Sequence, residues 1–398
     1  MFATKHPIAE NARSCMLKTV KIKNFRGFRQ FELHDLGRIN LLVGANNSGK
    51  TSALEAIQLL CARDNLKPLA DMIDRRGEYL WNERTSEKEL DIRHLFHNHK
   101  IGIEDKDKIE VLGESRGIDK SEKLTIISDL RMKRRREASD NRLEIDPRGT
   151  DDDLDDFKSL QMILDWSSGQ EQTGGCALNL SDQGGLSINS INSISIRARM
   201  GAFNILGSME TTEKSEFTTQ FVTSSGLTVP KVIELFERVV LTPEEETVYQ
   251  ALRAVEPKIE RIASVGSVSY NPLEESRQGF VVRANNSRMP IGSMGDGVWR
   301  MLGLTLAAVE ASNGFLFVDE IDTGLHFSAM NKMWELIWEV SKRLDVQIFA
   351  TTHSSDCWES LADVASRYDT TDDGITIQRI ERNQPMGRAN AYVSLQFG

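Results

Sequence analysis

Residues 44–51 read Gly-Ala-Asn-Asn-Ser-Gly-Lys-Thr and match the phosphate-binding pattern G-x-x-x-x-G-K-[ST]. The glycines allow the backbone to turn so that its N–H groups point inward at phosphate oxygens. In this pattern Lys50 reaches the β- and γ-phosphates and Thr51 binds Mg²⁺. The motif therefore predicts an ATP and Mg²⁺ site, whose cofactor-binding residues are Gly44, Asn46, Asn47, Ser48, Gly49, Lys50, Thr51 and Ser52.

The segments around this motif have the order that a phosphate-binding loop requires. Residues 39–43 (INLLV) predict a buried strand, and residues 52–61 place Leu54, Ile57 and Leu60 on one helical face. The helix that follows the loop adds the positive end of its dipole to the anion site. Upstream, residues 17–22 alternate apolar and polar side chains and predict a first strand.

A second motif, Phe-Leu-Phe-Val-Asp-Glu, occupies residues 315–320 and predicts a hydrophobic strand that ends in two carboxylates. Asp319 would hold Mg²⁺, and Glu320 would polarise the attacking water as a general base. A buried strand that ends in two acids is not rare by itself. Its presence in the same chain as a phosphate-binding loop predicts that Glu320 and Lys50 are catalytic.

Two further motifs follow from the same logic. The strand at 347–352 leads into Thr-Thr-His-Ser, and a histidine there can sense the γ-phosphate, so His353 is a third catalytic candidate, although a lone histidine is usually structural. Residues 290–297 (PIGSMGDG) precede a helix and offer a second anion site. One subunit does not need two such sites, so this loop would cap the phosphate bound by another subunit; a flexible glycine loop is the alternative.

Alternation of strands and helices at both ends of the chain predicts one parallel sheet assembled from distant segments. The predicted fold class is α/β, a P-loop NTPase head with a mixed sheet, an inserted antiparallel β subdomain and a helical lobe. The expected divisions are a tail (1–15), an N-terminal head part (16–100), a β-rich insertion (101–225), a helical lobe (226–285) and a C-terminal head part (286–398).

Net charge and charged segments limit which partner molecules the chain is expected to bind. The 398-residue chain has a formal net charge of −10, which argues against a surface coated with DNA contacts but allows a local basic groove. Residues 131–137 (RMKRRRE) are basic and residues 150–157 are acidic; a solvated loop is the ordinary interpretation, and a loop that binds DNA or a partner is the alternative. The sequence offers neither a membrane span nor a signal peptide, and its four cysteines fit a reducing compartment, so we expect a cytoplasmic protein.

The order IKNFRGF, GANNSGKT, SMGDG, FLFVDEIDTGLH and TTHS resembles the ABC/SMC-type ATPases of the RecF and OLD groups, within the AAA-family ATPases. The resemblance covers roughly residues 16–61 and 285–356. It implies an ATP-dependent dimer, with Asp319 and Glu320 as the Walker B pair. It also implies further nucleotide-site roles, for Arg26 after the first strand, Ser293 and Gly295 in the signature loop acting in trans, Asp322 in the D-loop and His353 as the switch histidine.

The sequence departs from this family in three places. Residues 90–99 (LDIRHLFHNH) lie where a Q-loop is expected but offer no glutamine, and the signature loop reads SMGDG rather than LSGGQ. OLD nucleases carry a Toprim domain after the switch histidine, whereas here only the residues from 354 to 398 follow it. The resemblance therefore implies the ATPase half of a split system, whose nuclease or toxin is a separate protein, as in phage-defence ATPases.

Four functions remain open from the sequence. The first is an ATPase that gates a partner effector, and the second is a RecF-like DNA repair ATPase that binds DNA across the dimer. The third is a transporter ATPase, against which the β insertion and the SMGDG loop count. The fourth is a nucleotide-sensing scaffold with slow turnover, against which Glu320 counts. Copurification with a nuclease would separate the first function from the second.

Overall fold

The computed structural model describes residues 16–63, 65–83, 86–99, 108–115, 121–133, 157–169, 171–191, 218–265, 280–285, 287–368, 374–383 and 388–397. The predicted tail at 1–15 and most of the charged segments at 131–137 and 150–157 lie outside these residues.

A sheet of 12 strands forms the centre of the described chain, and one half of it is parallel. The parallel strands, in spatial order, are β11 (Thr219–Val222), β15 (Phe315–Val318), β16 (Gln347–Thr352), β3 (Ile39–Val43) and β17 (Ile375–Asn383). Because their carboxyl ends share one edge, the motifs that follow β3, β15 and β16 are brought together there. These motifs are up to about 300 residues apart in sequence, so their meeting depends on strand order.

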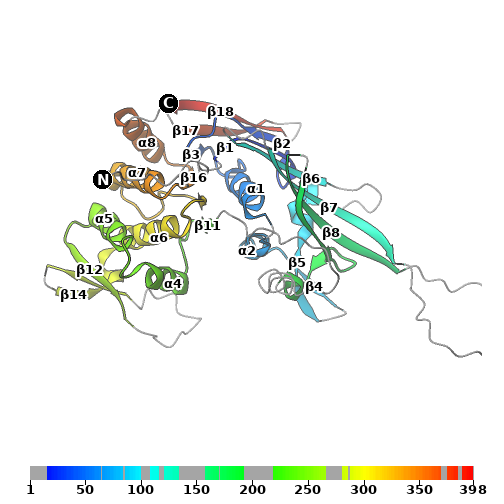
Figure 1. The fold of residues 1–398 in the computed structure, drawn as a ribbon, viewed down its shortest axis with the longest axis horizontal. Helices are drawn as coiled ribbons and strands as arrows, with labels where there is room; N and C mark the ends of the chain where they lie inside the picture. Colours follow the sequence, from blue (N-terminus) through cyan, green and yellow to red (C-terminus); the bar gives the residue numbers. More distant parts are fainter. Residues whose placement is uncertain are drawn as a thin grey trace, which may run out of the picture.

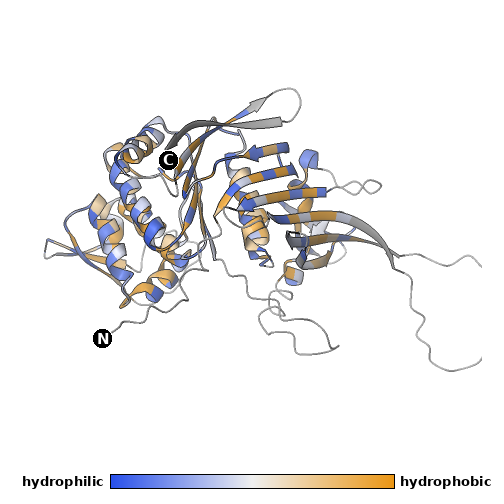
Figure 2. Ribbon diagram, turned by 45° about the horizontal axis from the view of Figure 1, so that its top comes forward, coloured by the Kyte–Doolittle hydropathy of each residue, from blue (hydrophilic) through white to orange (hydrophobic). Residues whose placement is uncertain are grey.

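The other half of the sheet is mainly antiparallel and curves away from the parallel strands (Figure 1). Its strands, in spatial order, are β18 (Arg388–Phe397), β2 (Phe28–Leu33), β1 (Leu17–Phe25), β6 (Lys108–Ser115), β7 (Ser121–Lys133), β8 (Phe157–Ser168) and β9 (Glu171–Asn179). Hydrophilic and hydrophobic residues alternate along β1 and β6 of this half (Figure 2), as expected where one face packs on a core and the other faces solvent.

Helices cover both faces of the parallel strands. Helices α1 (Lys50–Ala62) and α2 (Lys67–Arg75) fill the concave side of the sheet, and α6 (Asp296–Glu310), α7 (Phe327–Arg343) and α8 (Ser355–Arg367) lie on the opposite side (Figure 1). In β3, Leu42 packs in the α1 core while Ile39 and Leu41 pack in the α7–α8 core. A strand buried on both faces needs a mostly apolar sequence, and the one polar residue of INLLV, Asn40, is buried with its amide bonded to Gly37.

A third core joins the helices α4 (Val229–Val239) and α5 (Glu245–Val255) to α6 and to a small sheet. That sheet contains β12 (Ile259–Ser264), β13 (Phe280–Ala284) and β14 (Ser287–Pro290), and it leads into the short helix η3 (Ile291–Met294). Near β1 and α2 lie β4 (Tyr79–Asn82), β5 (Glu87–Asp91), β10 (Gly185–Leu186), η1 (Ile92–Leu95) and η2 (His97–His99).

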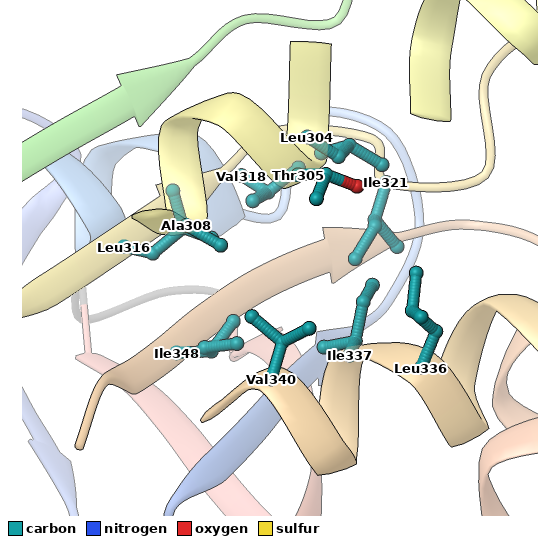
Figure 3. Close-up of a pocket in the computed structure, with 10 residues that line it drawn as sticks. All are labelled: Leu304, Thr305, Ala308, Leu316, Val318, Ile321, Leu336, Ile337, Val340 and Ile348. Atoms are coloured by element: carbon teal, nitrogen blue, oxygen red, sulfur yellow. The ribbon is translucent and has the colours of Figure 1, made fainter. Parts of the chain in front are cut away.

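The α7–α8 core contains a small void between α6, α7 and the strands β15 and β16 (Figure 3). Its volume is about 10 Å³, and apolar side chains such as Leu304, Leu316 and Ile337 line it. A space of this size, with Thr305 already bonded to the Met301 carbonyl, is a packing gap rather than a ligand site.

The predicted fold class is confirmed, since a mixed α/β sheet carries the phosphate-binding loop, antiparallel strands and a helical lobe. Two expected divisions differ in detail from the structure. Strand β11 falls inside the expected insertion at 101–225 but pairs with β15 in the parallel half. The expected helical lobe at 226–285 also contributes β12 and β13. No helix among the described residues is long and apolar enough to cross a membrane.

Candidate functional site

The phosphate-binding loop connects the end of β3 to the first residue of α1. Gly49 forms the N-cap of α1 with φ +103°, and no side chain caps the helix. A Cβ at this position would lie 2.6 Å from Phe28 Cζ, so both the backbone angle and the space require glycine. The uncapped N–H groups of the first turn are therefore available for an anionic ligand.

The side chains of the loop are arranged for the same ligand. Lys50 Nζ donates to the carbonyl oxygens of Gly44 and Ala45, at 2.7 and 2.9 Å. Burial lowers the pKa of Lys50, while the charges of Asp319 and Glu320 act in the opposite direction. The buried Oγ of Ser48 has no hydrogen-bond partner in the described protein. An orphaned hydroxyl beside an uncapped helix end fits a loop that binds phosphate oxygens.

Thr51 and Asp319 meet although 268 positions separate them in the chain. Thr51 Oγ1 lies 3.0 and 3.1 Å from the two carboxylate oxygens of Asp319. Magnesium prefers oxygen ligands at 2.0–2.1 Å in octahedral geometry, which places neighbouring ligand oxygens about 2.9 Å apart. The two residues that the sequence predicts as metal ligands therefore fit Mg²⁺ in chemistry and spacing. Among the described residues, no three or more His, Cys, Asp or Glu side chains form a group that could hold a metal ion.

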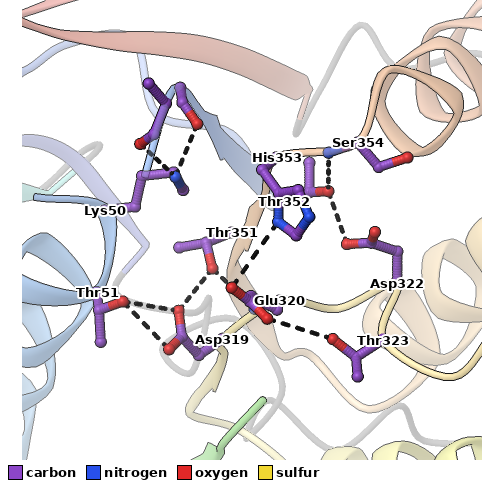
Figure 4. Close-up of polar contacts among 12 residues, drawn as sticks. Lys50, Thr51, Asp319, Glu320, Asp322, Thr323, Thr351, Thr352, His353 and Ser354 are labelled. Carbon is purple, nitrogen blue, oxygen red and sulfur yellow. Dashed lines mark hydrogen bonds and ion pairs between the residues drawn. The ribbon is translucent and has the colours of Figure 1, made fainter. Parts of the chain in front are cut away.

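Glu320 lies directly beside this pair, at the edge of the sheet (Figure 4). Its Oε1 is 3.8 Å from Nδ1 of His353, and its Oε2 accepts from Thr323 Oγ1 at 3.5 Å. Both Glu320 and His353 are partly accessible to solvent, so water can reach the carboxylate. The structure thus brings Lys50, Thr51, Asp319, Glu320 and His353, all predicted from sequence, to one edge of the sheet.

Asp322, expected in a dimer-contact loop, is held within its own chain. Thr352 Oγ1 donates to its Oδ1 at 2.6 Å, and the same hydroxyl accepts the backbone N–H of Ser354 at 3.0 Å. Asp322 therefore ties the loop after β15 to the end of β16. The carboxylate contributes to the site by fixing this loop, a role that the sequence motif does not reveal.

A pocket of about 840 Å³ opens beside the first half of the phosphate-binding loop. Residues 43–48 form one wall, His353 and Trp358 form another, and Arg379 and Glu381 of β17 complete it. Its volume is in the range of small-molecule sites. The sequence did not indicate that the end of β17 would border the loop.

Arg300 of α6 is a functional candidate that the sequence motifs missed. Its guanidinium is buried, and it donates to four backbone carbonyl oxygens, those of Thr223, Ser224, Asp319 and Glu320. Burial lowers the pKa of Arg300 to about 10. The signal available in the sequence was a single charged residue, Arg300, inside the mostly apolar stretch 298–309. Such a residue predicts a buried polar partner.

The same contacts identify the loop that lies beside the Walker B strand. Strand β11 runs parallel to β15, and the Asp319 N–H donates to the Val222 carbonyl at 2.8 Å. Residues 223–226 therefore lie next to Asp319. The segment 90–99, where the sequence suggested a Q-loop, instead packs against the turn between β1 and β2.

Arg26 occupies that turn and is paired with carboxylates. Its Nε lies 2.9 Å from Glu55 and its NH1 2.6 Å from Glu78, and its side chain is buried. The Arg26 N–H donates to the Leu95 carbonyl, and His97 Nδ1 contacts the Arg26 carbonyl oxygen at 2.9 Å. In this structure Arg26 joins α1 to the 92–99 segment, and its expected contact with nucleotide stays a prediction.

Ser293 and Gly295 lie on η3 and at the N-cap of α6, and both are exposed. The α6 N-terminus has no side-chain cap. It is a second uncapped helix end in addition to that of α1, and its first turn carries the exposed Asp296. The structure does not bring these two residues into the group around Asp319.

Three comparisons with known proteins show what this chain is similar to. The family model of the AAA ATPase domain matches residues 16–165 and 202–357. An ATP/GTP phosphatase of Helicobacter pylori is 22% identical over 374 residues, which cover 89% of this chain and 90% of that protein.

A shorter match, 59% identical over 39 residues, links the chain to the DNA replication and repair protein RecF of Nitrosococcus oceani. It covers 10% of this chain and 11% of that protein. Among solved structures, the SMC head domain from Thermotoga maritima has a TM-score of 0.42 at 14% identity, over 95% of this chain and 99% of that chain.

Proposed function

We propose a function on the premise that this chain belongs to the AAA ATPase domain family, whose model matches more than half of it. Its motifs make it an ABC/SMC-type P-loop ATPase. The proposal is that it hydrolyses ATP with Mg²⁺, that ATP joins two copies, and that the dimer gates a separate effector such as a nuclease. The setting that we propose is prokaryotic antiphage defence in the cytoplasm.

The observation that carries the hydrolysis proposal is the meeting of Thr51, Asp319, Glu320 and His353 at one edge of the sheet. The uncapped start of α1 and Lys50 would hold the phosphates, and Thr51 with Asp319 would hold Mg²⁺. Bound there, Mg²⁺ would neutralise charge on the phosphate oxygens. Glu320 would accept a proton from the attacking water, and His353 lies close enough to orient that carboxylate.

Dimerisation is supported by the position of the signature loop. Ser293 and Gly295 are exposed at an uncapped helix end, on a different helix from the phosphate-binding loop. The geometry supports contact between this end and the γ-phosphate bound by a second copy, since anions bind at such ends. A dimer made in this way would have two composite sites, each closed by ATP.

The effector proposal rests on the resemblance to split phage-defence ATPases. In such a pair the ATPase supplies a nucleotide-controlled switch and the partner supplies the nuclease or toxin chemistry. The described part of the chain offers the switch, because its catalytic groups all gather around the phosphate-binding loop.

A RecF-like repair ATPase is the second candidate. The short match to a DNA replication and repair protein favours it. It differs from the first candidate in that DNA, rather than an effector protein, would be bound across the dimer.

The test compares the wild type with Glu320→Gln, using Glu339→Gln as the control. Glu339 is an exposed carboxylate on α7, so its substitution changes the net charge equally. We would measure phosphate release and molecular mass by light scattering, with and without ATP, Mg²⁺ and DNA. Loss of a general base lowers turnover by about 10²–10⁴-fold.

We expect the wild type and Glu339→Gln to hydrolyse ATP, and Glu320→Gln to bind ATP and accumulate as a dimer. If neither wild type nor Glu320→Gln hydrolyses ATP or changes mass with ATP, the chain is a static scaffold and the proposal fails. Stimulation of hydrolysis by DNA would favour the repair function. Copurification of the trapped dimer with a nuclease would favour the effector function.

A further inference from the structure

Strand β16 ends in two adjacent threonines, Thr351 and Thr352, whose hydroxyl groups bind different carboxylates. Both side chains are fully buried. Thr351 Oγ1 donates to Asp319 Oδ1 at 2.7 Å, and Thr352 Oγ1 donates to Asp322 Oδ1 at 2.6 Å (Figure 4). Because successive side chains of a strand point to opposite faces, the two hydroxyls reach opposite sides of the loop that follows β15.

Thr351 makes two further contacts with that loop. Its Oγ1 accepts the backbone N–H of Glu320 at 2.8 Å, and its carbonyl accepts the N–H of Ile321 at 3.0 Å. A hydroxyl has one proton and two lone pairs, so donation to Asp319 and acceptance from Glu320 are compatible. One side chain thus connects the metal-site carboxylate to the backbone of the general-base candidate.

The backbone of Glu320 needs such support. Its φ is +47°, a left-handed conformation that is uncommon for a residue other than glycine. Strained backbone at a functional site persists only where the surroundings hold it. Here Thr351 holds the Glu320 N–H, and Arg300 NH2 holds its carbonyl at 2.8 Å. This conformation directs the Glu320 side chain toward His353.

We propose that Thr351 is a positioning residue for ATP hydrolysis, because its hydroxyl fixes Asp319 directly and Glu320 through the backbone. The proposal rests on the proposed ATPase function. In the described structure the polar partners of the Thr351 side chain are Asp319 and Glu320, and neither belongs to the phosphate-binding loop. Thr351 therefore acts on the chemical step and on Mg²⁺ dependence, while nucleotide affinity without the metal is independent of it.

Three variants test this role. Thr351→Val keeps the shape but removes the hydroxyl, and Thr351→Ser keeps the hydroxyl. Thr376→Val is the matched control, because Thr376 is a buried threonine of β17 in the same sheet whose Oγ1 donates to Asn40 Oδ1 at 2.8 Å. Thr351→Val loses two buried hydrogen bonds at the catalytic edge, whereas Thr376→Val loses one buried hydrogen bond away from that edge.

A misplacement near 1 Å at a reacting group lowers rates by about 10²-fold, so we expect kcat of Thr351→Val to fall roughly 30–100-fold. KM for ATP should stay within about threefold of the wild type, and Thr351→Ser should recover most of the rate. Thr376→Val should hydrolyse like the wild type. Without turnover, calorimetry in EDTA should give equal ATP affinities for Thr351→Val and wild type. The gain in affinity on adding Mg²⁺ should be smaller in Thr351→Val.

Each other outcome is decisive. Wild-type kcat in Thr351→Val overturns the inference, as does a weakened ATP affinity in EDTA. A Thr351→Val chain that fails to fold, while Thr376→Val folds, assigns Thr351 to fold stability alone. A wild type that does not hydrolyse ATP removes the proposed function instead. In that case the Mg²⁺-dependent gain in affinity still decides whether Thr351 positions Asp319.

Discussion

Replacing Arg300 with methionine would separate two parts of the site that its guanidinium joins. Arg300 is buried on α6 and donates to carbonyl oxygens on two loops, the one after β11 and the one after β15. Methionine has a similar length and fits an apolar helix surface, so packing is largely kept. The change therefore tests the hydrogen bonds and the charge more than the volume.

The loss of stability expected for Arg300→Met follows from the lengths of the four hydrogen bonds that Arg300 donates. The bonds to Thr223 and Glu320 are short, 2.7 and 2.8 Å, while those to Asp319 and Ser224 are 3.1 and 3.4 Å. Each buried carbonyl left without a donor costs about 1–3 kcal/mol, so two strong bonds amount to roughly 2–6 kcal/mol. Burial lowers the pKa of Arg300 to about 10, because the charged guanidinium loses its hydration there, and methionine avoids that cost. The net destabilisation expected for Arg300→Met is therefore about 1–3 kcal/mol.

The effect on hydrolysis should be larger than the effect on stability. Arg300 holds the Glu320 carbonyl in a left-handed backbone, so its loss frees the general-base candidate. We expect kcat to fall by about 10–100-fold. Arg300→Lys keeps the charge but lacks the planar fork of donors, and it should lie between Arg300→Met and wild type.

The assay is urea unfolding followed by fluorescence, together with steady-state ATP hydrolysis. Arg283→Met serves as the control, because Arg283 is 58% exposed on β13 and pairs with Glu260 at the surface. Surface ion pairs contribute about 0–1 kcal/mol, so this variant should behave nearly as wild type. An Arg300→Met protein whose free energy of unfolding lies within about 0.5 kcal/mol of wild type, with unchanged kcat, would show that Arg300 supports neither loop.

Two more predictions concern the phosphate-binding loop and the loss of stability at acid pH. Gly49→Ala should weaken ATP binding at least about tenfold and lower the free energy of unfolding in urea by about 2–4 kcal/mol. The reason is that the added Cβ would meet the buried Phe28 ring, at a φ that alanine adopts only with strain. Normal ATP binding would contradict this prediction. Hydrogen bonds from Lys108 and Lys123 lower the pKa of Glu110 to about 2. The ionised Glu110 therefore contributes fully to the free energy of unfolding above its ordinary pKa of 4.5, and this contribution is lost as pH falls toward 2. We expect Glu110→Gln to be about 1 kcal/mol less stable than wild type at pH 7 and equally stable near pH 2. A stability difference that is the same at both pH values would contradict this assignment.

The strands and the phosphate-binding loop were predictable because their signals are local. INLLV is buried on both faces of the sheet, and the glycine at position 49 is needed at a positive φ before α1. The acidic strand end at 319–320 was predictable for the same reason, since a short apolar run followed by two carboxylates is contiguous in sequence. The role of each of these residues in hydrolysis stays a prediction that the variants above would test.

Other parts of the site could not be predicted because their partners lie far apart in the chain. The carboxylates Glu55 and Glu78 that surround Arg26 could not be read from its motif, and its expected contact with nucleotide stays a prediction. The sequence left the Q-loop residue unassigned, because residues 90–99 offer no glutamine. Strand order puts residues 223–226 beside Asp319. A motif gives residue types, but it does not say which strand becomes the neighbour of β15.

The fold class, the phosphate-binding loop and the carboxylate pair could be predicted from the amino-acid sequence, because backbone turns and hydrophobic periodicity depend on residues that are adjacent in the chain. The remaining contacts of the site come from the folded chain. The fold set Thr51 against Asp319 across 268 positions, placed Arg300 between two loops and used Thr351 to connect Asp319 with Glu320. These contacts depend on the order of parallel strands and on side-chain directions at their ends, which long-range packing fixes and no local pattern encodes.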